Sequence, residues 1–425
     1  MSYQDFLSKK VKKASNTTVS HSGLSSFLFP YQQYAVERAL EVGNYGLFED
    51  CGMGKTVQQL EWADKVSRHT GEKVLIVSPL AVRAQTIQEA ETFGYDLDRF
   101  DVINYESLHK YSPDEYAGVV LDESSILKNF TGKMRNLIIN AWSDIKYKLA
   151  CTATPSPNDQ MELCNHAEFF QVMTRSQMLS MYFVNDMQTV QKWRLKGHAV
   201  KPFYKFMASW SLCAAKPSDL GFDDSGYELP GLHIHDHQIK TPNKGESLFN
   251  DVAVSATDFN KELRRTMTER VGQTVDLVSA KSEPVIVWCR LNEESEALAK
   301  AIPGAVEVKG SDKPEEKERR LLGFAKGDFQ VLVTKPKIAQ YGLNYQHCPN
   351  QVFASLDFSF ESLYQAIRRS YRFGQKNDVN IDLITTDSMQ NVRQSITHKM
   401  NAFEEMRTEL IKIQKQCFKS SMATV

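Results

Sequence analysis

The chain has 425 residues, 42% of them hydrophobic, and a formal net charge of −1, which together describe a globular protein of about two or three domains. No stretch approaches the roughly 18 consecutive apolar residues of a membrane span, and the N-terminus lacks the apolar core of a signal peptide. We therefore expect a protein of the bacterial or host cytosol without a membrane partner, whose near-neutral charge excludes a uniformly basic surface but allows a local basic groove.

Short apolar runs alternate with amphipathic segments over most of the chain, and this rhythm predicts parallel sheets. In the first half, the predicted buried strands are residues 74–77, 118–121 and 147–151. After a break, further strands are predicted at residues 285–288, 330–334, 352–356 and 379–384, with helices at 293–301, 314–326 and 389–415. The sequence therefore predicts an α/β fold with two parallel-sheet lobes in tandem.

Shifts in composition indicate where these lobes begin and end. Residues 1–20 hold four lysines among Ser, Asn and Thr, and they predict a flexible basic tail. Residues 216–245 contain several Pro and Gly residues and predict a linker between the lobes. We therefore assign residues 21–215 to the first lobe and residues 246–425 to the second, which ends in the terminal helix.

Residues 49–56 read EDCGMGKT and precede a segment that is compatible with a helix. Such a turn binds a nucleoside triphosphate, because small residues let backbone N–H groups point at phosphate oxygens and the helix N-terminus adds positive charge. A glutamate replaces the glycine that opens the usual pattern. The candidate phosphate-binding residues are Gly52, Met53, Gly54, Lys55 and Thr56, with Lys55 expected at the β- and γ-phosphates and Thr56 at magnesium.

Asp122 and Glu123 directly follow the predicted strand at 118–121. A magnesium-dependent ATPase needs such a pair of carboxylates, one to hold the metal and one to orient or deprotonate water. Asp122 suits the metal and Glu123 the water. The alternative is an ordinary exposed Asp-Glu pair, but the phosphate loop upstream favours catalysis. The hydroxyls of residues 152–155, which follow the next strand, are expected to hydrogen-bond this pair.

A third set of candidates lies at residues 365–375, which read QAIRRSYRFGQ. Spacings of three and four residues place Gln365, Arg369 and Arg372 on one face of a predicted helix. Planar guanidinium groups presented together suit a polyphosphate. The alternative is a basic helix face that is merely exposed to solvent. In that case the phosphate loop and metal site of the first lobe would have no arginine finger.

In their order and spacing, these motifs resemble the Swi/Snf-like ATPase branch of the superfamily-two helicases and translocases. The matching segments cover nearly the whole chain: 30–32 (PYQ), 49–56, 77–79 (VSP), 104–106 (NYE), 122–129 (DESSILKN), 152–155 (TATP), 334–335 with 342–344, and 365–375. The resemblance implies two RecA-like lobes with an ATP cleft between them. The compact length and the Ser-Ser of the DEAH-type box are most similar to phage or bacterial members.

The resemblance also implies the cofactors, ATP and Mg²⁺, and the roles of individual residues. Gln32 would read the adenine, and Gly342 and Gln365 would also lie at the nucleotide. Arg369 and Arg372 would be arginine fingers that stabilise charge on the transferred phosphoryl group.

DNA is the partner that the resemblance implies, with a duplex as the usual track and translocation as the usual result. The residues expected to contact nucleic-acid phosphates are Ser78, Asn104, Lys128, Thr334 and Lys335, each of which is alternatively an ordinary loop residue. At the motif that includes Thr334 and Lys335, residues 336–341 replace the tandem glycines of the family. The sequence therefore leaves open which path this segment follows along the DNA strand. No protein partner is indicated, and we expect a monomer.

Alternative functions and two further segments stay open at this point. The chain is alternatively a strand-separating helicase on forked or single-stranded substrate, or a binding module without catalysis, which the complete catalytic set disfavours. The alternating histidines of residues 233–237 suit a metal, but without a cysteine or acidic cluster we prefer a half-exposed strand that bridges the lobes. The aromatic residues of 193–210 either pack inside the protein or stack on bases.

Overall fold

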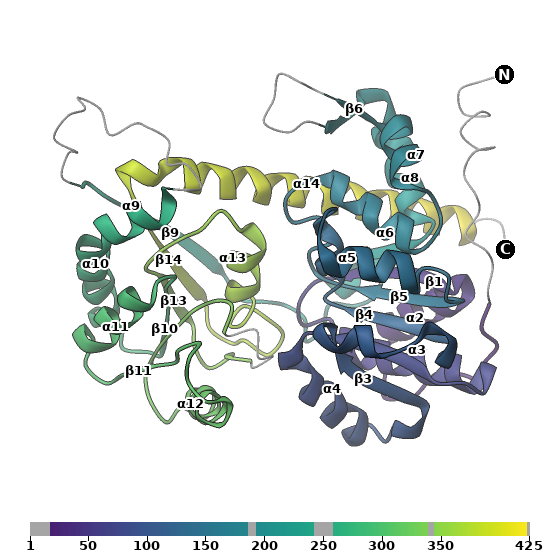
Figure 1. Ribbon diagram of the computed structural model, residues 1–425, viewed down its shortest axis with the longest axis horizontal. Coiled ribbons are helices and arrows are strands. Elements are labelled where there is room, and N and C mark those ends of the chain that lie inside the picture. Colours follow the sequence, from purple (N-terminus) through teal and green to yellow (C-terminus); the bar gives the residue numbers. More distant parts are fainter. Residues whose placement is uncertain (1–17, 186–192, 242–257, 339–343, 423–425) are drawn as a thin grey trace. The chain divides into compact units, whose positions relative to one another are not determined.

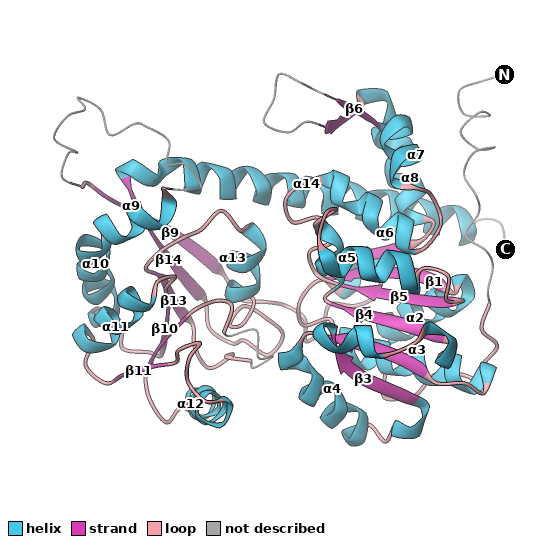
Figure 2. Ribbon diagram, in the orientation of Figure 1, coloured by secondary structure: helices cyan, strands magenta, loops and turns pink. Residues whose placement is uncertain are grey.

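The computed structural model describes residues 18–185, 193–241, 258–338 and 344–422. The chain divides into two compact units, Met1–Asp224 with Ala402–Val425 and Ser225–Asn401. Each unit contains one six-stranded sheet with helices around it, so the predicted α/β class is confirmed (Figures 1 and 2). None of the described helices combines the length and the apolar composition needed to cross a membrane.

The sheet of the first unit has the strand order β3-β2-β4-β5-β1-β8, and all of its neighbouring strands are parallel. Its strands are β1 (Asn44–Glu49), β2 (Val74–Ser78), β3 (Phe100–Asn104), β4 (Gly118–Asp122), β5 (Tyr147–Cys151) and β8 (Ser211–Ala214). Burial on both faces explains the continuous apolar runs at β2, β4 and β5, from which these strands were predicted.

Helices and a small hairpin complete the first unit. They are α2 (Pro30–Val42), α3 (Lys55–Thr70), α4 (Leu80–Thr92), α5 (Lys133–Leu137), α6 (Leu163–Phe169), α7 (Arg175–Tyr182), α8 (Val200–Ala208) and the antiparallel strands β6 (Phe183–Asn185) and β7 (Trp193–Leu195). Phe203, Phe206 and Trp210 are buried, and Phe206 meets Trp210 edge to face. These rings therefore pack inside the unit and are not free to stack on bases.

The sheet of the second unit has the strand order β11-β12-β10-β13-β14-β9 and is also parallel throughout. Its strands are β9 (Leu232–Ile239), β10 (Val285–Trp288), β11 (Ala305–Glu307), β12 (Val331–Thr334), β13 (Asn350–Phe353) and β14 (Val379–Thr386). Its helices are α9 (Phe259–Arg265), α10 (Met267–Ser279), α11 (Asn292–Ala301), α12 (Pro314–Lys326) and α13 (Phe360–Ile367), and α14 (Gln390–Met422) begins here. Two clusters of buried apolar side chains form its core.

The edge strand β9 falls inside the segment that was predicted as a linker. It is largely exposed, and its histidines face side chains on or next to β14. His233 Nε2 lies 3.0 Å from Asp378 Oδ2, and His237 Nε2 lies 2.7 Å from Asp382 Oδ1. Among the described residues, no group of three or more His, Cys, Asp or Glu side chains is arranged to hold a metal ion. The histidines therefore form pairs across two strands.

The last part of α14, from Ala402 onward, belongs to the first unit, although the sequence grouped it with the second lobe. Its Gln414 side chain accepts a hydrogen bond from Cys213 N–H (3.2 Å) and donates one to Ser211 O (2.9 Å). Both partners lie on β8, which is an edge strand of the described sheet. The glutamine therefore forms hydrogen bonds with backbone groups on the side of β8 that has no neighbouring strand.

Lys148, the second residue of β5, is a buried lysine that has no carboxylate hydrogen-bond partner among the described residues. Its ammonium group donates to the carbonyl oxygens of Ser143 and Phe169, the latter at 3.2 Å. Phe169 is the last residue of α6, and Ser143 follows the π-helical turn Ile138–Trp142, so the ammonium satisfies two helix ends. Burial lowers the pKa of Lys148 to about 8, and nearby Asp144 opposes this shift.

We expect the free energy of unfolding of the wild type, relative to Lys148→Met, to rise between about pH 8 and pH 10.5. In this window the folded lysine is neutral while the unfolded lysine, with its ordinary pKa of 10.5, still binds a proton. The effect amounts to at most roughly 3 kcal/mol. Urea unfolding at both ends of the window measures it, with exposed Lys146→Met as the control. Parallel pH profiles for wild type and Lys148→Met would contradict this expectation.

Candidate functional site

The loop between β1 and α3 has the backbone geometry of a phosphate-binding turn. Gly52 and Gly54 have φ values of 93° and 78°, which side-chain-bearing residues rarely adopt, and Lys55 begins α3. Lys55 Nζ donates to the carbonyl oxygens of Glu49 (2.9 Å) and Asp50 (3.0 Å), so its ammonium lies over its own loop. Thr56 follows on the first turn of the helix, where it is half-buried.

The carbonyl oxygen of Met53 is the meeting point of three side chains. It accepts hydrogen bonds from Tyr31 Oη (2.8 Å), Gln32 Nε2 (3.1 Å) and Gln58 Nε2 (3.2 Å). A Cβ atom at Gly54 would lie 2.3 Å from Gln32 Nε2, so Gly54 is needed for space as well as for its φ. The glutamine expected to read adenine is therefore hydrogen-bonded to the phosphate loop.

Asp122 ends β4 and is buried. Its Oδ1 accepts a hydrogen bond from Gln59 Nε2 of α3 (2.7 Å), and its carbonyl oxygen accepts one from Tyr105 Oη (2.6 Å). Burial raises the pKa of Asp122, while the Gln59 hydrogen bond and the charge of Lys55 act in the opposite direction. The Gln59 hydrogen bond joins Asp122 to the helix that begins at Lys55, directly after the loop.

Glu123 is the second carboxylate of the pair and has a left-handed backbone with φ of 52°. Thr152 Oγ1 donates to Glu123 Oε2 at 3.2 Å and accepts from Thr154 N–H at 3.1 Å. The expectation that hydroxyls of the 152–155 segment bond the carboxylate pair is confirmed for Thr152, whereas the buried Thr154 hydroxyl has no hydrogen-bond partner among the described residues. Burial by itself lowers the pKa of Lys55. The nearby groups of Cys51, Glu123, Glu49 and Asp50 favour its charged form, and the net pKa of Lys55 is raised.

Residues that the sequence analysis did not single out complete this site. Gln58 and Gln59 are buried polar residues on α3, and Gln58 Nε2 also donates to Glu49 Oε2 at 2.6 Å. Burial raises the pKa of Glu49 to about 7, against the effects of Lys55 and Gln58. The sequence contained a sign of this role: two consecutive glutamines come shortly after Gly-Lys-Thr, between buried apolar residues of α3.

The donors at this site fit Mg²⁺ and a triphosphate. Magnesium prefers oxygen ligands, and Asp122 supplies a buried carboxylate while Thr56 supplies a half-buried hydroxyl. The glycine loop and the N-terminus of the 16-residue helix α3 supply N–H groups, and Lys55 supplies the cation. These residues would hold the metal and the phosphates.

In the second unit, the prediction of one helical face for Gln365, Arg369 and Arg372 is wrong. α13 ends at Ile367, so only Gln365 is helical, and both arginines lie in the turn that follows. The helix stops because Arg369 N–H bonds the carbonyl of Ala366 only three residues back, while the Arg369 carbonyl accepts from Tyr345 N–H at 2.9 Å.

The two arginines have different surroundings in the second unit. Arg372 Nη1 donates to Asn344 Oδ1. Arg369 is half-buried, and its guanidinium makes no hydrogen bond or ion pair within the described part of the chain. Gly342, a further nucleotide candidate, lies outside the described residues.

The nucleic-acid candidates occupy strand ends, but several of their side chains have partners inside their own unit. Ser78 is buried, and Asn104 Oδ1 accepts from Ser107 N–H at 2.8 Å. Lys128 is half-buried and ends the 3₁₀ turn after Glu123. These residues therefore stand at the predicted edge of the first sheet, where backbone groups as much as side chains are available.

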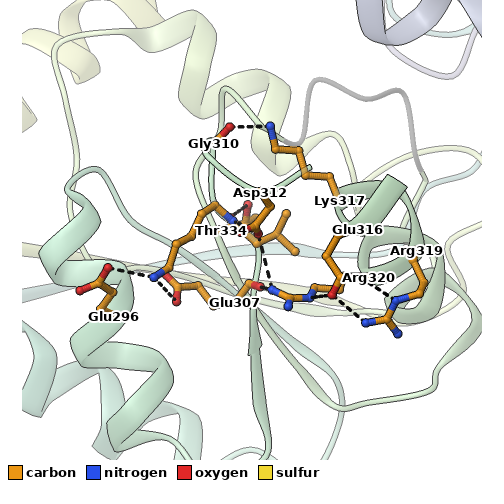
Figure 3. A network of polar contacts seen from close by, with 11 residues as sticks. Glu296, Glu307, Gly310, Asp312, Glu316, Lys317, Arg319, Arg320 and Thr334 are labelled. Carbon is orange, nitrogen blue, oxygen red and sulfur yellow. Dashed lines mark hydrogen bonds and ion pairs between the residues drawn. The ribbon is translucent and has the colours of Figure 1, made fainter. Parts of the chain in front are cut away.

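Thr334 ends β12 in the second unit, and Lys335 follows it. Thr334 Oγ1 is buried and donates to the carbonyl oxygen of Val308 at 3.1 Å, which ties β12 to the loop after β11. Figure 3 shows this loop braced further by polar contacts, including Lys317 Nζ to Gly310 O (2.5 Å). Lys335 Nζ reaches Asn292 Oδ1 at 2.5 Å. The Thr334 hydroxyl is thus used internally.

A pocket of about 350 Å³ opens beside Lys335, next to the carboxyl ends of β10, β12 and β13. Arg290, Lys335 and Lys337 line it together with the hydroxyls of Ser359 and Ser362. Arg290 pairs with Asp357 at 2.6 Å. Basic and hydroxyl groups around an open pocket suit a phosphate, and of these residues the sequence analysis had singled out Lys335 alone.

Comparison with known proteins gives a family match and many similar solved structures. Residues 269–374 match the family model of the helicase conserved C-terminal domain. The Sulfolobus solfataricus SWI2/SNF2 ATPase core in complex with dsDNA is similar to this chain, with a TM-score of 0.43 and 15% identity over 94% of this chain and 97% of that chain. No curated protein matches the chain. The matched residues include the predicted motifs at 334–335 and 342–344 and nearly all of the motif at 365–375.

Proposed function

We propose that this chain is a DNA-stimulated ATPase that moves along duplex DNA. The observation that carries the proposal is that Lys55 comes after β1, while Asp122 ends β4 and Glu123 follows it, in one parallel sheet. Gln59, on the helix begun by Lys55, donates to Asp122 at 2.7 Å. A module that only sensed a nucleotide would need the phosphate loop. It would have no use for a second carboxylate held by a threonine hydroxyl beside that loop.

In the proposed reaction, the loop N–H groups and Lys55 would bind the phosphates, and Thr56 and Asp122 would hold Mg²⁺. The metal would neutralise charge on the phosphate oxygens. Glu123 orients the attacking water and accepts its proton, while Thr152 fixes the carboxylate by donating to Oε2. Gln32 reads the adenine, and its bond to Met53 O links that reading to the loop.

The second unit is proposed to supply Arg369 and Arg372 as fingers that stabilise charge on the transferred phosphoryl group. Support comes from the order of the motifs and from the helicase domain match over residues 269–374. Gln365 and Gly342 are proposed near the nucleotide on the same basis.

DNA is proposed to contact strand ends of both units through its phosphates, without reading the sequence. Ser78, Asn104 and Lys128 would serve in the first unit, and Lys335 in the second. Because the Thr334 hydroxyl already donates to Val308 O, Thr334 would contribute its backbone. The pocket lined by Arg290 and Lys337 supports a phosphate contact beside Lys335.

We expect ATP turnover to rise sharply with added duplex DNA and the rise to weaken as salt increases, because phosphate contacts release counterions. Steady-state turnover with duplex, single-stranded, forked and RNA ligands measures this. Displacement of a roadblock from a duplex, without release of a labelled strand, distinguishes translocation from unwinding. Turnover that ignores every nucleic acid would contradict the proposal, and strand release from forks would favour an unwinding helicase.

A further inference from the structure

The backbone of Glu123 has a conformation that residues with side chains rarely adopt. Its φ and ψ are 52° and 53°, in the left-handed region. Only Gln171 shares a positive φ among the non-glycine residues that the structure describes. Such a conformation persists where surrounding contacts hold it. Contacts that fix the chain beside Glu123 therefore determine where its carboxylate points.

Helix α6 provides these contacts from outside the recognised motifs. Ser124 begins the 3₁₀ turn Ser124–Lys128, and its Oγ lies 3.0 Å from His166 Nε2. The preceding residue of α6, Asn165, donates through Nδ2 to the carbonyl oxygens of Leu127 (2.8 Å) and Lys128 (3.4 Å). Two adjacent side chains of one helix thus hold both ends of the turn that follows Glu123.

His166 has no competing polar role within the described residues. The side chain is fully buried, and its Nδ1 has no hydrogen-bond partner there. Burial lowers the pKa of His166 to about 3, so the ring is neutral at physiological pH. Its ring meets Phe48 edge to face, with centroids 5.2 Å apart, and Phe48 lies on β1 just before the phosphate loop.

We propose that His166 is a positioning residue for ATP hydrolysis, which holds Glu123 in its left-handed conformation through the hydrogen bond to Ser124. The same ring packs against β1, so one side chain fixes the water-orienting carboxylate relative to the strand that leads into the phosphate loop. The inference rests on the proposed catalytic role of Glu123. The phosphate loop itself does not depend on the His166–Ser124 bond.

Steady-state ATP turnover of the full chain tests the proposal in Ser124→Ala, His166→Leu and the double variant. Each single variant is expected to lose about tenfold in kcat, as the loss of one hydrogen bond implies, with little change in KM for ATP. The double variant is expected to lose no more than the worse single variant, because both changes remove the same bond. His166→Gln, whose amide can occupy the place of Nε2, is expected to restore most of kcat.

Cys164→Ala is the matched control, because Cys164 is buried on the same helix and its side chain makes no hydrogen bond to the turn Ser124–Lys128 among the described residues. It should lower the melting temperature without lowering kcat of the folded protein. Unchanged kcat in Ser124→Ala and His166→Leu, or equal losses in Cys164→Ala, would overturn the positioning role while leaving the ATPase proposal intact. A wild type that hydrolyses no ATP would overturn both.

Discussion

Replacing Glu123 with glutamine should abolish ATP turnover while leaving the affinities for ATP and duplex DNA close to those of the wild type. The amide keeps the size of the side chain and can still accept from Thr152 Oγ1, which lies 3.2 Å from Glu123 Oε2. It cannot take a proton from water. General-base removal typically costs about 10² to 10⁴ in rate. Single-turnover hydrolysis and binding of a fluorescent ATP analogue measure the two effects separately.

Glu91→Gln is the control for this substitution, because Glu91 is an exposed carboxylate of the same unit on α4 and lies outside the motifs. Its turnover should match the wild type. Lys55→Ala should also abolish turnover, but it should weaken ATP binding, since its ammonium is the cation of the loop. Glu123→Gln with turnover within a few-fold of the wild type would exclude Glu123 as the residue that handles water.

The second large effect is expected from Arg369→Ala and Arg372→Ala. Arginine fingers contribute about 10³ to 10⁵ in rate, so each variant should lose turnover by that order and retain ATP binding by the first unit. The unpartnered guanidinium of Arg369 within the described residues favours the larger loss there. Arg372 also bonds Asn344, so its loss should perturb the second unit as well. Turnover and thermal melting together separate these contributions.

Arg319→Ala is the matched control, because Arg319 is an exposed arginine of the second unit whose guanidinium pairs with Glu316 on α12. We expect it to leave turnover unchanged. Lysine at 369 should rescue little, since an ammonium cannot reproduce the planar fork of a guanidinium. Full activity in both alanine variants would refute the finger assignment and would restrict catalysis to residues of the first unit.

The sheets were largely predictable because local apolar runs carry the signal for buried parallel strands. The prediction at 147–151 matches β5, and that at 314–326 matches α12. Strand β1 was not predicted, since Asn44 and Gly46 interrupt its apolar pattern. Strand β9 was not assigned to the second sheet, because an exposed edge strand carries polar residues such as His233 and His235.

Some features of the candidate site were also predictable from the sequence, and others were not. Lys55, Asp122 and Glu123 were predicted from a turn motif and from their place after apolar runs. The end of α13 at Ile367 was not predicted, because it depends on a hydrogen bond from Tyr345 N–H to the Arg369 carbonyl. Helical spacing in a sequence does not reveal that a loop residue distant in the chain, Tyr345, donates a hydrogen bond to the Arg369 carbonyl.

The sequence by itself determined the α/β class, the phosphate loop, the carboxylate pair and the order of the motifs, because each depends on neighbours in the chain. Only the tertiary structure decided which groups hold these residues in place: Gln59 on Asp122, Thr152 on Glu123 and His166 on Ser124. Such partners come from segments about 30 to 60 residues away, and their approach is set by sheet order and helix packing rather than by any local pattern.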